Sequence, residues 1–75
     1  MSQIAVEEVP GGYCIHDLQK GFVAASDPNL FVGDQSNAKT FTDSRELFEF
    51  CFGHAMNIAD GPKEILDDWG KFLDE

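Results

Sequence analysis

The stretch 42–59, TDSRELFEFCFGHAMNIA, holds the densest apolar cluster of the sequence and is expected to organise the fold. At about 100° per residue, Leu47, Cys51, His54 and Ile58 fall along one helical face, which neighbouring aromatic side chains widen. The resulting apolar arc spans about 200°, whereas a helix covered on one side needs a stripe of only ~100°. We therefore predict one helix over residues 43–59, covered on two sides.

The ends of this helix are marked by local signals. Asp43 followed three residues later by Glu46 matches a capping box, which predicts the helix start, and Thr42 is the competing N-cap. The run Asp60-Gly61-Pro62 cannot continue a helix, which predicts its end. A second helix is predicted over residues 62–74, because the apolar residues after Pro62 recur at helical spacing and form a narrow stripe.

The first part of the chain reads as short strands separated by turns. Four apolar or alternating segments lie between residues 4 and 32, and Pro, Gly, Asn and Asp occupy the positions between them. Strands first and helices last are typical of an α+β fold. We predict a single domain over residues 1–75, with a small antiparallel sheet of three to four strands followed by two helices packed on one face.

The charge balance restricts the classes of partner. Fourteen acidic residues against five lysines and arginines give a net charge of −9. Direct binding to nucleic acid or to an anionic membrane is disfavoured, because both require a cationic surface. A protein partner with a basic surface is favoured. No apolar run approaches ~18 residues and no signal peptide is recognisable, so with two cysteines we expect a cytoplasmic protein.

A metal site is the most specific chemistry that the residue types suggest. Cys14 and His16 are two apart on a predicted strand, and Cys51 and His54 are three apart on the predicted helix. Each pair points to one side, so together they supply four candidate zinc ligands. However, the strand pair lies opposite the face that carries Tyr13 and Ile15. We therefore favour buried thiols and a hydrogen-bonded core His54, and we expect no metal and no cofactor.

Catalysis finds no support in the motifs. The sequence has no nucleophile elbow, HExxH, CxxC or glycine-rich phosphate loop. Adjacent carboxylates such as Asp67 and Asp68 point apart on a helix, which does not suit shared acid–base chemistry. We expect that the protein is not an enzyme.

The leading hypothesis is a small acidic protein-binding module that occupies the basic, nucleic-acid-binding surface of another protein. Carboxylates would take the place of phosphates, and exposed aromatic rings would anchor the contact. In size, charge and layout the chain resembles small acidic α+β proteins among phage-encoded inhibitors of host nucleases and CRISPR complexes. The resemblance includes no motif and transfers no site. The candidate contact residues are the acids of the two helices: Glu46, Glu49, Glu64, Asp67, Asp68, Asp74 and Glu75.

Two alternatives stay open. The surplus apolar arc, with Phe50, Phe52 and Met56, predicts a homodimer interface if the chain is a structural or regulatory protein. A small zinc-binding protein built on the Cys and His residues is the other alternative.

Overall fold

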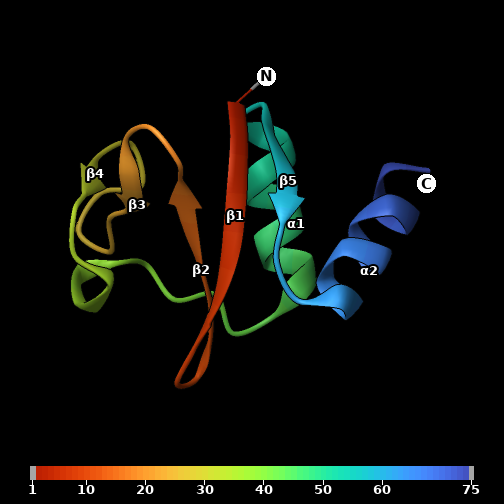
Figure 1. Cartoon of the computed structure of the whole chain (residues 1–75), viewed down its shortest axis with the longest axis horizontal. Coiled ribbons are helices and arrows are strands. Elements are labelled where there is room, and N and C mark those ends of the chain that lie inside the picture. Colours follow the sequence, from red (N-terminus) through yellow and green to blue (C-terminus); the bar gives the residue numbers. More distant parts are fainter. Residues whose placement is uncertain (1, 75) are drawn as a thin grey trace.

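The first half of the chain forms an antiparallel meander in the computed structural model, which describes residues 2–74 (Figure 1). Strand β1 (Ser2–Val9) pairs with β2 (Gly12–Asp17), and β2 pairs with β3 (Gly21–Val23), which pairs with β4 (Phe31–Val32). The turn residues that separate these segments in the sequence therefore lie at the strand ends, as expected.

The β1–β2 turn depends on Gly12. Its φ of +156° suits glycine, and a Cβ at this position would collide with the carbonyl oxygen of Phe41. This close approach lets Tyr13 and Phe41 exchange two backbone hydrogen bonds, with N···O distances of 2.9 and 2.7 Å. The segment that leads into the first helix is thereby held against β2.

The predicted helix over 43–59 is wrong in its second half. Helix α1 covers Ser44–Gly53, and Met56–Asp60 is a strand, β5, parallel to β1. His54 caps the helix and Ala55 turns the chain with a φ of +54°. The start is confirmed, because the Asp43 carboxylate accepts a hydrogen bond from the Arg45 N–H at 3.0 Å.

The fifth strand changes the sheet from the predicted antiparallel form to a mixed one. The strand order is β4-β3-β2-β1-β5, so β1 lies inside the sheet and not at its edge. The three to four strands that were predicted are present, and β5 adds the parallel neighbour of β1. The α+β fold class is confirmed.

The two helices cover one face of this sheet. Helix α2 (Lys63–Leu73) follows β5, and in Figure 1 α1 lies behind β5 with α2 beside it. Within residues 2–74, neither helix is long and apolar enough to cross a membrane. The core lies between helices and sheet, and its largest fully buried side chains include Phe41, Ile4, Ile15, Leu47 and Ile65.

The opposite face of the sheet is covered differently. The loop after β4 contains a 3₁₀ turn (Gln35–Asn37), and the Gln35 amide lies 2.9 Å from a Glu7 oxygen and 4.0 Å from the Cys14 sulfur. Glu7 and Cys14 are cross-strand partners and share a face. A loop with polar contacts therefore takes the place of a helix on this side.

Candidate functional site

The acidic residues are concentrated in the second half of the chain. Nine of the fourteen lie from Asp43 onward, together with three of the five lysines and arginines. Both helices bury their apolar faces against the sheet, so their polar faces point away from it. We use the name acidic helical surface for the exposed acids of α1, of α2 and of the α2 C-cap: Glu46, Glu49, Glu64, Asp67, Asp68 and Asp74.

These six residues are the predicted contact residues that the structure describes, and all are exposed. Glu75, the seventh, lies outside the described residues. Lys63 and Lys71 are interspersed among the acids of α2, and Arg45 lies 3.8 Å from Glu49 one turn along α1. An exposed pair of this kind contributes about 0.3–0.5 kcal/mol. The surface is therefore acidic with a few basic positions.

A groove of about 260 Å³ runs along the seam between the helices. Its walls are Ser44, Arg45 and Phe48 from α1, and Asp68, Lys71 and Phe72 from α2. The ring centroids of Phe48 and Phe72 are 5.6 Å apart. The Arg45 Cζ atom lies over the Phe72 ring, 5.6 Å from its centroid. An apolar floor between charged rims gives the groove an amphipathic character.

Phe52 extends the apolar floor of this groove to the surface. Its side chain is 65% exposed, and its ring meets the edge of Phe72 with centroids 6.2 Å apart. Phe72 in turn stacks on the buried Trp69, with ring centroids 5.7 Å apart. The exposed Phe52 ring thus contacts Phe72, which is itself stacked on the buried Trp69.

Arg45 and Phe72 were not among the predicted contact residues. The helical spacing of Arg45, Phe48 and Phe52 on one flank of α1 was a usable signal. The facing flank of α2, with Asp68 and Phe72, was another. Which flanks face each other depends on helix packing, so the groove itself was not readable from the sequence.

The three residues of the predicted dimer interface do not form one patch. Phe52 is exposed on the α2 side of α1, whereas Phe50 is half-buried between Phe41 and His54. Met56 lies on β5 and is only 7% exposed within the core. They appeared adjacent because residues 54–59 were placed on the helix.

The Cys and His residues are also kept apart. Cys51 is a residue of α1 and faces the core, while Cys14 and His16 lie on the other face of the sheet. His54 is exposed, and its Nδ1 lies 2.9 Å from the Phe50 carbonyl oxygen. The predicted core position of His54 is therefore wrong, because the helix ends before it. Within residues 2–74, no group of three or more His, Cys, Asp or Glu side chains is placed to hold a metal ion.

Burial keeps both thiols protonated. It raises the pKa of the Cys51 thiol to about 12. The pKa of Cys14 is also raised, first by burial and then by the negative charge of Glu7. A protonated thiol is a poor nucleophile and a poor metal ligand, so neither cysteine is prepared for such chemistry.

Cys14 and His16 belong to a small polar network on the loop-covered face. His16 Nδ1 lies 2.8 Å from Glu7 Oε2, and the His16 ring stacks on Phe22 at 4.2 Å. Gln35 donates to the other oxygen of Glu7 at 2.9 Å. These contacts attach the loop to the strands.

Comparison of the chain with protein-family models, with curated proteins and with solved structures finds no match.

Proposed function

We propose that this chain is a cytoplasmic, non-catalytic protein-binding module whose acidic helical surface occupies a basic, nucleic-acid-binding surface of another protein. The observation that carries the proposal is the combination of six exposed helical acids with the exposed ring of Phe52 beside them. Phosphate-binding surfaces present lysine and arginine side chains, for which carboxylates are suitable counter-ions.

Charge supports the encounter step of such binding. A chain with a net charge of −9 attracts a cationic partner over roughly a Debye length, about 8 Å at physiological ionic strength. Exposed charges mainly accelerate association and select against acidic partners, and they contribute less to the lifetime of the complex. A second feature is needed for a long-lived complex.

Phe52 and the groove provide that second feature. A large exposed ring on a rigid helix, supported by Phe72, is the type of residue that dominates binding energy at interfaces. The partner we propose therefore carries an apolar contact between basic residues. Asp68 and Lys71 on the groove rim would set the orientation of that contact.

An inhibitor encoded by a phage or another mobile element is the biological role that fits this mode of binding. Occupying the nucleic-acid site of a host protein needs charge complementarity and a compact scaffold, and it needs no catalysis. In this role the protein competes directly with nucleic acid.

Competition with nucleic acid is the test of the proposal. A partner captured from host lysate is purified, and its affinity for the chain is measured with and without saturating oligonucleotide at two salt concentrations. We expect the oligonucleotide to displace the chain and higher salt to weaken the complex. A complex that is indifferent to both would contradict the proposal.

Two triple variants with equal loss of charge locate the surface. Glu64→Gln, Asp67→Asn and Asp68→Asn remove three charges from α2. Glu8→Gln, Asp27→Asn and Asp34→Asn remove three charges from outside the helices and retain the side-chain oxygens that accept the Asn29 and Ser36 N–H groups. We expect the helical variant to weaken binding at least tenfold and the control variant less than threefold. Equal losses would mean that net charge alone mediates binding.

A further inference from the structure

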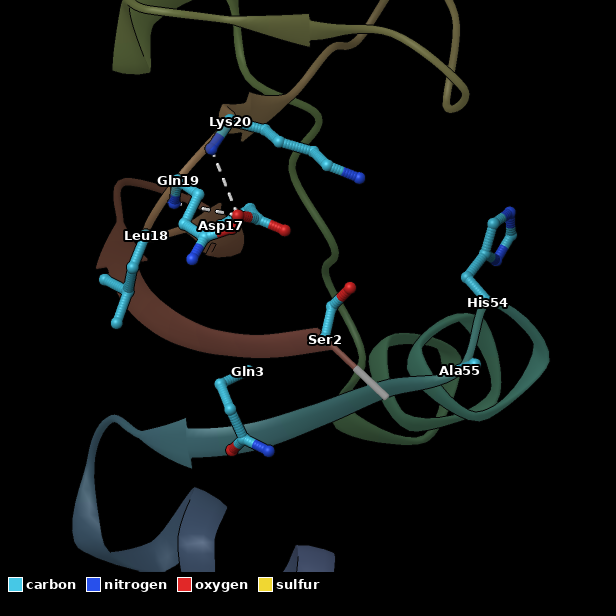
Figure 2. A pocket seen from close by; sticks show the side chains of 8 residues that line it. All are labelled: Ser2, Gln3, Asp17, Leu18, Gln19, Lys20, His54 and Ala55. Carbon is cyan, nitrogen blue, oxygen red and sulfur yellow. Dashed lines mark hydrogen bonds between the residues drawn. The ribbon is translucent and has the colours of Figure 1, made fainter.

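A second surface feature lies far from the groove, at the end of the sheet where β1 begins. A cavity of about 550 Å³ opens there, within the range of about 300–1,000 Å³ that holds small ligands. Three chain segments form its walls (Figure 2): the start of β1, the β2–β3 turn and the α1–β5 turn. The lining residues are Ser2, Gln3, Asp17, Leu18, Gln19, Lys20, His54 and Ala55.

Asp17 is the buried charged group of this cavity. The residue is only 4% exposed, and its Oδ1 accepts the backbone N–H groups of Gln19 at 2.9 Å and Lys20 at 3.1 Å. Within residues 2–74, Oδ2 has no hydrogen-bond or ion-pair partner and points into the cavity (Figure 2). Because no buried side-chain oxygen of these residues lacks a partner, Oδ2 is an atom that solvent reaches from the cavity. The turn therefore uses one carboxylate oxygen and leaves the other available to a ligand.

The neighbouring cation does not neutralise Asp17. The Lys20 ammonium lies 5.4 Å from the centre of the Phe31 ring, in a cation–π contact, and forms no ion pair with Asp17 within 4.0 Å. The Asp17 carboxylate thus has two N–H donors and no counter-ion among the described residues, so its negative charge is open to a cation in the cavity.

The other polar groups around the cavity favour a ligand with many donors. His54 Nδ1 faces the Phe50 carbonyl oxygen and so carries the proton, which leaves Nε2 as an acceptor in the neutral ring. Ser2 and Gln19 carry donor and acceptor atoms, so their oxygens are also available to a cation. Guanidinium has a positive charge and five N–H donors, which suit the Asp17 carboxylate first and these neutral acceptors second. Asp17 is the one acid among the described lining residues, which favours an organic cation over a metal ion.

We propose that the sheet-end cavity binds a guanidinium group, with Asp17 Oδ2 as its counter-ion. The proposal does not depend on the function of the acidic helical surface, because the two sites share no residue. The guanidinium belongs either to a small metabolite-like cation or to an arginine of a polypeptide.

The test is an NMR titration of the ¹⁵N-labelled chain with two probes, agmatine and the blocked tripeptide Gly-Arg-Gly. We expect the amide signals of Leu18, Gln19, Lys20 and Ala55 to shift with saturation, while those of Asp68 and Lys71 stay in place. Tighter binding of agmatine assigns the cavity to a small cation, and tighter binding of the peptide assigns it to a polypeptide arginine. The tripeptide with citrulline, a neutral isostere of arginine, is the matched ligand control.

Two substitutions identify the recognised charge. Asp17→Asn keeps an oxygen for the Gln19 and Lys20 N–H groups and removes the charge, so we expect the Kd for both probes to rise at least tenfold. Lys20→Gln removes a competing cation, so affinity is expected to stay equal or to increase. Absence of shifts in the unsubstituted chain, equal binding of citrulline and arginine peptides, or loss of binding in Lys20→Gln alone would each overturn the proposal.

Discussion

Both faces of the sheet carry buried residues, but the types of residue that are buried differ between them. On the helix side, Ile4, Val6 and Ile15 pack against α1 and α2 in a continuous apolar core. On the loop side, the buried residues are small, with Ala5, Cys14 and Ala24, and the covering segment is attached by polar contacts from Gln35. The helix side therefore contributes most of the hydrophobic stabilisation, since stabilisation scales with the apolar area removed from water.

The difference also shows where the proposed binding surface lies. The helices contribute large side chains to the core and present acids and Phe52 to solvent, so the proposed surface is on the same elements that form most of the core. The loop side contributes little apolar area and holds a hydrogen-bonded network. Substitutions on the two faces should therefore differ in size and in kind.

Adjacent residues of β2 provide the strongest test, because Ile15 and Cys14 are both fully buried and point to opposite faces. Ile15→Ala is expected to reduce the free energy of unfolding by about 2–5 kcal/mol, which is a large fraction of the stability of a small domain. Cys14→Ala removes one sulfur atom and should cost about 1 kcal/mol. Urea denaturation measures both, and equal losses would contradict the proposed difference between the faces.

Gly12→Ala should produce the next largest effect. The new Cβ would collide with the Phe41 carbonyl oxygen in a backbone conformation that favours glycine. We expect a loss of about 1–3 kcal/mol in the free energy of unfolding. Gly11→Ala is the control, because its Cβ meets no atom within 4 Å while its φ of +90° is also positive. A Gly11→Ala variant as unstable as Gly12→Ala would show that backbone strain, and not the collision, is responsible.

The N-cap of α1 is a smaller contribution. Asp43→Ala removes the acceptor for the Arg45 N–H and should reduce the free energy of unfolding by about 1 kcal/mol. Asp43→Asn retains an acceptor oxygen and should lose much less. Thermal denaturation of both variants gives the comparison, and similar losses would assign the effect to charge and not to the cap.

The two cysteines provide a kinetic comparison of the faces with little change in stability. At pH 8 both native thiols should react slowly with a disulfide reagent, since burial raises the pKa of Cys51 to about 12 and also raises that of Cys14. Gln35→Ala removes the side chain next to Cys14 and should accelerate its reaction severalfold, leaving Cys51 unchanged. Single Cys→Ala variants assign the rates, and acceleration at Cys51 would indicate global opening.

The misplaced end of the first helix shows why part of the fold was not predictable. Cys51, Ala55 and Ile58 continue a helical apolar spacing, but Met56 and Ile58 also alternate as in a strand. Residues 56–60 form a strand and not a helix because β1 has a second edge with unpaired backbone N–H and C=O groups. Strand β5 pairs with that edge. That edge is created by the tertiary structure, and Gly53 at the helix end was the sole local hint.

The candidate sites also divide into features that the local sequence predicts and features that depend on tertiary contacts. The acids of α1 and α2 were predictable as exposed, since each lies opposite an apolar stripe. The groove needed the packing of two helices, and the sheet-end cavity needed three segments that are distant in sequence. Asp17 was not predicted as a site residue, because an aspartate before a turn is common in any protein. Its burial depends on contacts with other segments of the chain.

By itself, the sequence determined the fold class, the meander, the start of α1, the second helix and the acidic character of the chain, because these follow from local spacing, turn residues and composition. The tertiary structure decided where α1 ends, that a parallel strand completes the sheet, and which side chains line the groove and the cavity. Those features depend on contacts between residues far apart in the chain, and local pattern carries no information about which distant groups will need a partner.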